Sequence, residues 1–531
     1  MTDAYIIDAA RTPRGIGKAG KGALSEFHPS RLLAKVFEGI AERNSLNTED
    51  IDDVVVGCSS QVGKQGSCVG RMAALDAGWS ENASAVTLDR FCGSGITSVN
   101  LAAANIMSGM DELCVAGGVE MMSYTATLVP ENNNRTVDGG NLHLRNLHPQ
   151  PHQGICADMI ATLEGFSRED VDALAVESQR RAKHAIDNGY FDKSLIPVFN
   201  DDGTLALDRE EFPRPGTTMA SLAELRTVFD QFMNAPIDDT GETFDQLVKR
   251  AYPDLTINHV HHAGNSSGVV DGAAALILSS KAYADKAGWK PRARIRAIAT
   301  VGGDPTLMLN EPVPAARKAL ARAGMTTNDI DLFEVNEAFS VVAAKFIRDL
   351  ELDPEKVNVN GGAMALGHPI AATGSILIGT VLDELERRDL TTGLVTMCTG
   401  GGMAPAIIID LAGNEVTEML LLKRDDGRMK TYLYRSNLLL AELGTENPAN
   451  REAEKSPQQI AYDEIVARYP SLYTYPPCYG IRPSSSNLVG ELMARDKIDV
   501  TAVETLAAQC GENFCLALVG NKIATLCPAS R

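Results

Sequence analysis

Cys92 is the residue whose surroundings first indicate chemistry. It lies in the segment DRFCGSGI, residues 89–96, where the β-leaning run Val86 to Leu88 gives way to a helical pattern. A thiol on such a turn faces open space, and the unpaired N–H groups and positive dipole end of the helix favour its thiolate. The arrangement predicts a nucleophile, although an isolated cysteine in a chain with ten is more often a small buried hydrophobe.

Three further segments place polar or sulfur side chains beside apolar runs or glycines. They are NEAF at 336–339, GGAMALGHP at 361–369 and MCTGGG at 397–402, and they contain Asn336, His368 and Cys398. Proline fixes φ directly after the histidine, and the glycines let a backbone approach a ligand closely. Taken singly, each segment also suits a helix cap, a structural histidine or a turn.

Together the four segments resemble the active-site loops of the thiolase family, which read Cys-x-Ser, Asn-Glu-Ala-Phe, Gly-His-Pro and Cys-x-Gly in this order. Supporting blocks are IIDAARTP at 6–13, GGVEMMS at 117–123 and AGNSSG at 263–268. The resemblance covers about residues 1–412 and does not extend to residues 413–531.

The resemblance implies an acetyl-CoA C-acyltransferase of fatty acid metabolism. Such an enzyme cleaves a 3-ketoacyl-CoA with CoA through a Cys92 acyl-enzyme, as in β-oxidation, or runs the reverse Claisen condensation to acetoacetyl-CoA. His368 would take the Cys92 proton, Cys398 would be the second acid and base, and Asn336 would hold a water for the first oxyanion. The backbone N–H groups of Cys92 and Gly400 would receive the thioester oxygen.

The resemblance also implies that CoA is a cosubstrate, held by Arg226, Ser267, Ala338 and Phe339, and that no tightly bound cofactor and no metal are needed. From the sequence alone, Arg226 is equally a solvated surface charge and Ser267 a turn residue. Arg226 suits CoA because the acidic chain, with a formal net charge of −20, needs local cations to hold an anionic ligand.

Several residues depart from the family pattern. QGICAD at 153–158 stands where many thiolases have Met-Gly-x-Thr-Ala-Glu, so acyl-pocket contacts cannot be transferred from that loop. Ala371 replaces the usual glycine after Gly-His-Pro, and its methyl group narrows either the helix packing or the site. His261 and His262 are adjacent and would point to opposite faces of a strand, which argues against a shared metal.

Two other functions fit the sequence less well than this prediction. A decarboxylating 3-ketoacyl synthase of the same fold does not need a second acid/base cysteine, so Cys398 argues against it. A non-catalytic CoA-binding scaffold protein could lose either cysteine, whereas all four catalytic positions are filled here.

The chain contains an internal repeat that predicts its fold class. Residues 50–57 recur in form as 329–336, residues 86–89 as 357–360, and residues 113–118 as 397–402. The last pair gives Cys114 the repeat position of Cys398, and we expect Cys114 to be structural. With β-like runs alternating with helical stretches, the pattern indicates α/β units. The resemblance implies two duplicated βαβαβαββ halves stacked as a five-layer α-β-α-β-α core.

The helical stretches are expected at Pro29–Ala41, Ile96–Met107, Arg168–Asn188, Pro314–Ala323 and Thr373–Arg387. Between the halves lies an insert too long for an ordinary connection, which the resemblance identifies as a CoA-binding loop domain. The predicted domains are 1–123 plus 251–284 for the first half, 124–250 for the loop domain, 285–412 for the second half, and 413–531 for a small extension. In the extension, turn signals predict hairpins at 425–427 and 520–521, and a helix is expected at 458–468.

Composition indicates a large enzyme with several cores, since 531 residues carry 44% hydrophobic side chains. The negative charge argues against nucleic acid and against anionic membranes. The N-terminal residues resemble no export signal, no apolar run is long enough for a membrane span, and the cysteines are dispersed. We therefore expect a cytoplasmic protein, and the resemblance implies a homodimer or homotetramer.

Overall fold

A computed structural model describes residues 3–129 and 135–412 of the chain, together with five strands beyond residue 412. The chain divides into two compact units, Met1–Ala412 and Gly413–Arg531. The first unit contains every residue predicted to act in the site.

The first unit is built from two topologically equivalent halves and an insert. The first half contains β1 (Ala4–Arg11), β2 (Gly15–Ile16), α1 (Pro29–Asn44), β3 (Asp53–Gly57), α2 (Val69–Asp76), β4 (Ser84–Leu88), α3 (Ser94–Ser108), β5 (Leu113–Met121), α4 (Met122–Thr125), β8 (Val270–Ser280) and α10 (Lys281–Ala287). The second half contains β9 (Ala293–Gly302), α11 (Pro312–Ala323), β10 (Leu332–Val335), α12 (Ser340–Asp349), α13 (Ala363–Leu366), α14 (Ile370–Arg388), β11 (Thr392–Thr396) and β12 (Met403–Leu411). The helices expected in the two halves are confirmed, with ends shifted by a few residues.

The strand order confirms the duplication. In the first half the order is β1-β8-β5-β3-β4, and in the second it is β9-β12-β11-β10. In the first half β5, β3 and β4 are parallel to one another, and in the second half β11 and β10 are parallel. The pairs β5–β8, β11–β12 and β12–β9 are antiparallel. Val357 forms a parallel bridge with β10, in the place that β4 takes beside β3 in the first half. A short antiparallel pairing of β1 with β9 joins both halves into one sheet of ten described strands.

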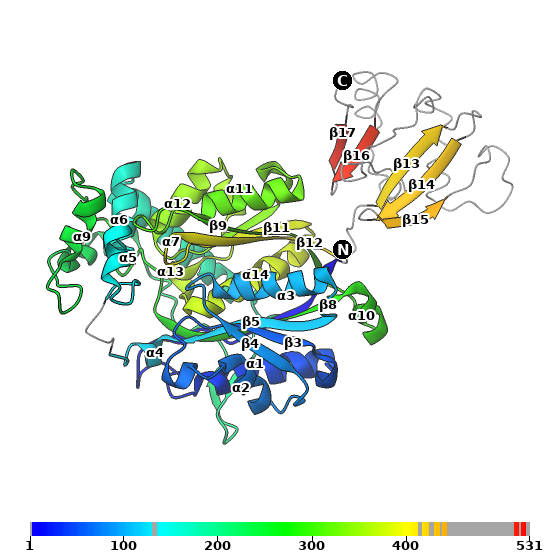
Figure 1. Ribbon diagram of the computed structural model, residues 1–531, viewed down its shortest axis with the longest axis horizontal. Coiled ribbons are helices and arrows are strands. Elements are labelled where there is room, and N and C mark those ends of the chain that lie inside the picture. The colour runs from blue at the N-terminus through cyan, green and yellow to red at the C-terminus, as the bar shows by residue number, and fades with distance from the viewer. Residues whose placement is uncertain are drawn as a thin grey trace. The chain divides into compact units, whose positions relative to one another are not determined.

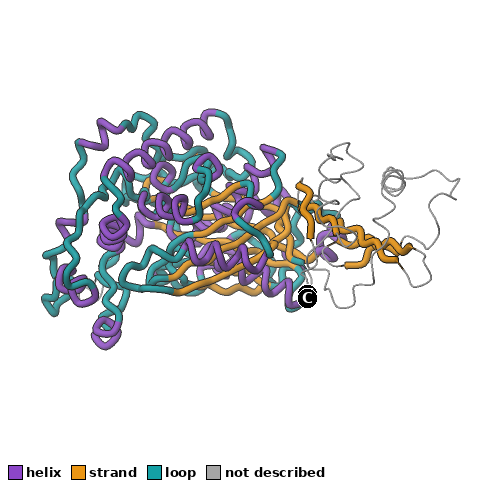
Figure 2. Tube along the Cα trace, turned by 90° about the horizontal axis from the view of Figure 1, so that it is seen from above, coloured by secondary structure: helices purple, strands orange, loops and turns teal. Residues whose placement is uncertain are grey.

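The layers follow from this pairing. Figure 1 shows α11 and α12 over the strands β9, β11 and β12, then α3 and α14, then β3, β4, β5 and β8, and finally α1 and α2. Seen from above in Figure 2, the strands of this unit run side by side with helices over them. The five-layer α/β prediction is therefore confirmed.

Helices α3 and α14 meet at the centre of these layers. Fifteen residues of α14 are buried, consistent with a helix covered on all sides. Close approach depends on glycine, because a Cβ on Gly95 would lie 2.6 Å from the Ala371 carbonyl oxygen and a Cβ on Gly374 would lie 2.3 Å from the Ile96 nitrogen. Ala371 thus lies in the helix packing, one of the two places where its methyl group was expected to matter.

One detail of the predicted repeat is wrong. Cys114 pairs with Asp53 in β3, whereas the equivalent residue Leu332 of β10 pairs with Gly393. The repeat position of Cys114 is therefore Gly393 and not Cys398, an error of five residues. Similar glycine runs after the two cysteines caused the misalignment, because glycines carry no register information.

The insert forms a mostly helical layer at one end of the core. It contains α5 (Leu142–Leu147), α6 (Gln153–Glu164), α7 (Arg168–Asp187), β6 (Val198–Phe199), β7 (Leu205–Leu207), α8 (Met219–Ala223) and α9 (Phe244–Ala251). Helix α7 begins at a capping box of Ser167 and Asp170, which satisfies its first N–H groups. In Figure 1 the helices α5, α6 and α9 gather at the end of the sheet layers.

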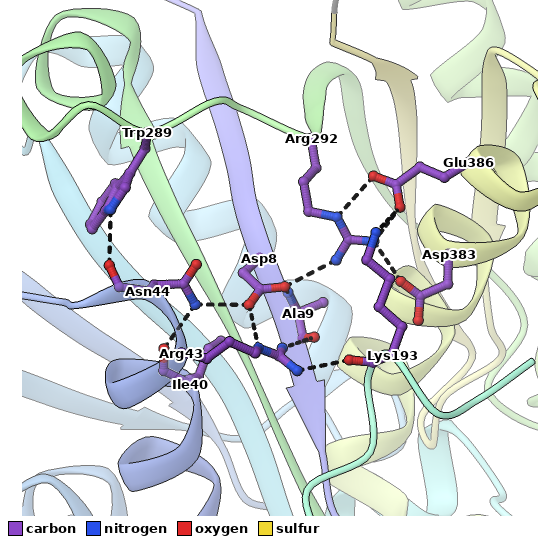
Figure 3. A network of polar contacts seen from close by, with 10 residues as sticks. All are labelled: Asp8, Ala9, Ile40, Arg43, Asn44, Lys193, Trp289, Arg292, Asp383 and Glu386. Atoms are coloured by element: carbon purple, nitrogen blue, oxygen red, sulfur yellow. Dashed lines mark hydrogen bonds and ion pairs between the residues drawn. The ribbon is translucent and has the colours of Figure 1, made fainter. Parts of the chain in front are cut away.

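A network of charges joins the two halves (Figure 3). Arg292, between them in sequence, pairs with Asp8 of β1 at 3.0 Å and with Asp383 of α14 at 2.5 Å. Arg43 of α1 pairs with the other oxygen of Asp8 at 2.7 Å. One buried carboxylate on β1 thus links an outer helix of the first half to the central helix of the second.

The second unit contains two described groups of strands. Strands β13 (Thr417–Lys423), β14 (Met429–Arg435) and β15 (Leu438–Glu442) form an antiparallel sheet, and β16 (Cys515–Val519) pairs with β17 (Lys522–Leu526). Both predicted hairpins are confirmed by these pairings, while their turn residues and the helix expected at 458–468 lie outside the described residues.

Candidate active site

Cys92 lies in the turn between β4 and α3, as predicted. Phe91 adopts a positive φ of 48°, which is unfavourable for an aromatic residue and marks a tightly constrained turn. The Ser94 hydroxyl holds this geometry, because it accepts a hydrogen bond from the Arg90 N–H at 2.8 Å and donates one to the Phe91 carbonyl at 2.6 Å. The turn presents Cys92 at a cavity wall, where it is partly exposed.

The electrostatics of Cys92 differ from the prediction made from the helix dipole. Burial, followed by the negative charge of Glu120, raises the pKa of Cys92 to about 12, and Asp89 adds to the rise. The Glu120 carboxylate is buried and accepts hydrogen bonds from the Ser59 N–H at 3.0 Å and the Gln65 amide at 2.7 Å. The expected thiolate is therefore wrong for the unliganded site, and the thiol needs a base.

His368 lies in the turn between α13 and α14. Gly367 has a φ of 94°, and a Cβ there would lie 2.4 Å from the Val270 side chain, so the position requires glycine. The His368 N–H donates to the Gly268 carbonyl at 2.9 Å, and Nδ1 is hydrogen-bonded to the Thr373 hydroxyl at 2.5 Å. Nε2 is buried and has no hydrogen-bond partner among the described residues.

The imidazole is neutral in this setting. Burial, and then the positive charge of Arg14, lowers the pKa of His368 to about 3. Its Nδ1 partner is a hydroxyl group rather than a carboxylate, so no anion at Nδ1 stabilises an imidazolium. A neutral imidazole with an unpaired Nε2 can accept a proton or donate a hydrogen bond at that atom, depending on its tautomer.

Asn336 follows directly after β10. Its backbone N–H donates to the Thr396 carbonyl at 3.2 Å, and both atoms of its buried side-chain amide lack a partner within the described part of the chain. An unsatisfied buried amide is costly, so a water or a ligand is its expected partner. The next residue, Glu337, accepts hydrogen bonds from Ser178 at 2.6 Å and from Asn358 at 3.0 Å, which ties this loop to α7.

Cys398 and Gly400 follow β11. Burial, and then the nearby Cys92 thiol, raises the pKa of the buried Cys398 thiol, so the two sulfurs lie within electrostatic reach of each other. Gly400 packs against the nucleophile turn, since a Cβ on it would lie 2.9 Å from the Phe91 ring. Any larger residue at position 400 would push the Cys92 turn away.

A cavity of about 370 Å³ brings the first and second halves together with the insert. Cys92, His368 and Gly400 line it, together with the predicted CoA contacts Ser267 and Phe339. The rest of the wall is formed by Ser59, Phe91, Met122, Arg135, Val137, Pro151, His152, Gln153, Phe229, Ser266, Gly268, Val269, Met308 and Ile370. The mainly apolar wall suits an acyl or pantetheine chain.

The other two predicted CoA contacts lie elsewhere. Ala338 reaches the cavity wall indirectly, because its carbonyl accepts the Ser267 N–H at 3.0 Å. Arg226 lies between α8 and the turn at Phe229, and its side chain is exposed and outside the cavity wall. The structure thus leaves Arg226 accessible to a solvent-facing part of a ligand.

Sequence reasoning missed several residues of the site. Thr373 orients His368, and its place five residues later, in the first turn of a helix, could have indicated this. Phe91 and Glu120 lie in segments that carry the family resemblance, but their roles were not predicted, because these depend on a backbone angle and on burial. Met122 and Met308, from opposite halves of the chain, line the same cavity only because of the fold.

His261 and His262 have structural partners. His261 Nδ1 lies 2.7 Å from Asp158, and His262 Nε2 lies 2.8 Å from Asp172. The two histidines thus contact different carboxylates, and Asp158 is shared with His259. In the described part of the chain, no group of three or more His, Cys, Asp or Glu residues is arranged to hold a metal ion.

This fold and this site define a cysteine-containing acyltransferase enzyme, and comparisons with known proteins agree. The thiolase N-terminal domain family matches residues 4–232, and the thiolase C-terminal domain family matches residues 289–411. Proteins named 3-ketoacyl-CoA thiolase from Shewanella oneidensis, Serratia proteamaculans and Cronobacter sakazakii are each 38% identical over 417 residues, which is 77% of this chain and 100% of each relative. The chain belongs to the thiolase family.

Within the described ranges, no helix is both long enough and apolar enough to cross a bilayer.

Proposed function

We propose that this thiolase cleaves 3-ketoacyl-CoA with CoA to give acetyl-CoA and a shortened acyl-CoA, using Cys92 as the nucleophile. The observation that carries the proposal is the shared cavity, which is lined by Cys92, His368 and Gly400, together with the lack of a partner for His368 Nε2 among the described residues. The names of the relatives support the substrate class.

The first half-reaction breaks the C2–C3 bond of the substrate. Cys92 Sγ attacks the 3-keto carbon while its proton passes to His368 Nε2, and the resulting oxyanion is stabilised by His368 and a water on the Asn336 amide. Collapse expels the acetyl-CoA enolate and leaves the acyl group on Cys92. Cys398 gives its proton to C2 of the enolate, whose oxygen lies at the N–H groups of Cys92 and Gly400.

The second half-reaction returns each proton. The Cys398 thiolate takes the proton of an incoming CoA thiol, and the CoA sulfur attacks the acyl carbon on Cys92. Cys92 leaves and recovers its proton from His368. Because burial keeps both thiols protonated in the free site, this sequence starts from a neutral Cys92 and a neutral base.

CoA acts as a cosubstrate in this proposal. Ser267, Ala338 and Phe339 would hold the pantetheine near the cavity, and the exposed Arg226 would meet a phosphate group. Charge attraction of this kind is local, because the chain as a whole is acidic. We place the loop domain at 124–250, between the halves 1–123 plus 251–284 and 285–412.

The experiment compares acetoacetyl-CoA with longer 3-ketoacyl-CoA substrates, each with added CoA. Faster turnover of the longer substrates and an acyl adduct on Cys92, seen by peptide mass spectrometry, support the proposal. An adduct on another residue, or absence of acetyl-CoA formation from every substrate, would refute it.

We also propose a cytoplasmic homodimer or homotetramer, as the family resemblance implies. Light scattering on the purified chain tests the assembly, and a monomer with full activity would refute it. Cell fractionation tests the location.

A further inference from the structure

A buried ion pair lies behind the loop that carries His368. Arg14, just after β1, and Glu210, from the insert, have side chains only 3% and 1% exposed. Arg14 Nη2 lies 2.8 Å from Glu210 Oε1, and the Arg14 backbone N–H donates to Glu210 Oε2 at 2.8 Å. Both the main chain and the side chain of Arg14 thus contact Glu210, which leaves the guanidinium little freedom to move.

A second guanidinium makes this cluster positive. Arg11 Nη1 lies 2.7 Å from the same Glu210 oxygen. Burial alone would raise the pKa of Glu210, but the charges of Arg11 and Arg14 outweigh it and hold the pKa at about 2. Two guanidinium groups, always protonated in proteins, therefore share one ionised carboxylate.

Arg14 is also the member of the cluster that reaches the active-site loop. Its Nη1 lies 3.5 Å from the carbonyl oxygen of Gly367, the residue before His368. Burial is the larger cause that lowers the pKa of His368, and the positive charge of Arg14 lowers it further.

The other groups around His368 include one carboxylate, Glu120 on β5, which accepts a hydrogen bond from the Ala371 N–H at the start of α14. Thr373 on α14 is a neutral hydroxyl, and Cys92 and Cys398 are thiols whose pKa values are raised. Glu334 on β10 also interacts with Arg14, and burial with its acidic neighbours raises its pKa well above the ordinary range, which favours its neutral form. Burial and the charge of Arg14 both disfavour an imidazolium.

We propose that Arg14, with Glu210 as its counter-ion, is a positioning residue that adds to burial in disfavouring a protonated His368 in the free enzyme. This inference rests on the proposed function, in which neutral His368 accepts the Cys92 proton. A triad with a carboxylate behind its histidine stabilises the imidazolium; here a guanidinium does the opposite. The free site therefore holds a thiol and an imidazole rather than a thiolate–imidazolium pair, and the thiolate forms only when substrate is bound.

The test uses charge changes of opposite sign. Arg14→Met removes one positive charge, Glu210→Gln removes the negative charge, and Arg14→Lys keeps the positive charge as a control. For each full-length variant, kcat/KM for acetoacetyl-CoA thiolysis and the rate of Cys92 alkylation by iodoacetamide are measured from about pH 3 to pH 9.

Arg14→Met should move the low-pH limb of kcat/KM upward by about one pH unit, the size expected when a nearby like charge is removed. The imidazolium becomes easier to form, so alkylation of free Cys92 near neutral pH should be about tenfold faster. Glu210→Gln should slow the same alkylation, and Arg14→Lys should resemble the original protein.

Equal effects of Arg14→Met and Arg14→Lys, or alkylation changes of the same sign in Arg14→Met and Glu210→Gln, would overturn the proposal and leave a purely structural role. If Glu210→Gln does not fold, the comparison of Met with Lys at position 14 still decides. The proposed function fails separately, if Cys92→Ser retains thiolysis.

Discussion

Cys92 and Cys398 carry the same chemical group in different surroundings. Cys92 is partly exposed at the cavity wall, whereas Cys398 is buried behind it. Burial raises the pKa of both thiols, so neither is a thiolate at neutral pH in the free site. We expect Cys92 to be the attacking thiol because it is the more exposed, and the buried Cys398 to hold and return a proton.

Replacing Cys92 by serine tests the nucleophile. An alcohol is much harder to deprotonate than a thiol, so Cys92→Ser should lower thiolysis by at least about 10³-fold while leaving the fold intact. Acyl-CoA labelling followed by intact-protein mass spectrometry should show no acyl adduct. Substantial thiolysis by a variant with an unchanged circular dichroism spectrum would remove Cys92 from this role.

Replacing Cys398 by alanine separates the two thiols. Cys398→Ala should still accept an acyl group on Cys92 from a simple acyl-CoA, because that step needs only Cys92 and His368. Exchange of the acetyl-CoA α-protons into deuterated water should slow by about 10²- to 10⁴-fold, the usual contribution of a positioned acid or base. Normal exchange, followed by NMR, would assign the proton to another group.

The Thr373 hydroxyl can be removed almost isosterically. Thr373→Val deletes the 2.5 Å hydrogen bond to His368 Nδ1 and frees the ring to turn. We expect kcat/KM to fall by about tenfold, the equivalent of one net hydrogen bond, with a smaller change in KM. Thr373→Ser, which keeps the hydroxyl, is the matched control, and equal losses in both variants would contradict an orienting role.

At the scale of elements, α3 and α14 position the two sides of the reaction. Cys92 precedes α3 and His368 precedes α14, and the helices touch through Gly95 and Gly374. The distance between Cys92 and His368 therefore depends on how closely the backbones of α3 and α14 approach each other. Small residues at this contact act on catalysis without meeting the substrate.

Gly374→Ala tests this dependence. Its methyl group would lie 2.3 Å from the Ile96 backbone nitrogen, so the helices must separate. Overpacking of this kind costs about 1–3 kcal/mol, more than the roughly 1 kcal/mol that alanine gains in a helix. Urea unfolding should show the loss, and kcat should fall.

Gly216→Ala is the control for that measurement, because a Cβ there has no heavy atom within 4 Å among the described residues. Its free energy of unfolding should be unchanged or slightly raised. Equal stability of the two variants would mean that the α3–α14 contact adapts to a methyl group.

At the scale of the whole molecule, the residues predicted to act in the site all lie in the first compact unit. The four loops and the cavity lie within residues 1–412, and the first compact unit ends at Ala412. Both family matches end by residue 411. Strand β12 is the last strand of the second half.

A chain truncated after Ala412 should keep its turnover. We expect kcat and KM for a 3-ketoacyl-CoA to change by less than about twofold, because both halves and the insert fold as one unit with its own core. The full-length protein is the control, with light scattering to follow assembly. A folded truncation with little activity would mean that residues 413–531 complete the site.

Sequence alone determined the features that depend on local order. The strand-to-helix turn at Cys92, the helix spans, the duplicated halves and the order of the loops are written in short-range patterns of apolar residues, glycines and prolines. Such patterns act through backbone geometry and hydrophobic periodicity, so the fold class followed from them. The Cys114 register failed because glycine runs look alike in any register.

Only the tertiary structure decided the electrostatics. The helix dipole predicted a Cys92 thiolate, but burial and the distant Glu120 outweigh it. Arg14 is an ordinary charge in the sequence and becomes significant only when Glu210 and the His368 loop pack around it. A pKa depends on desolvation and on charges summed over every segment nearby, and that sum exists only after segments hundreds of residues apart have come together.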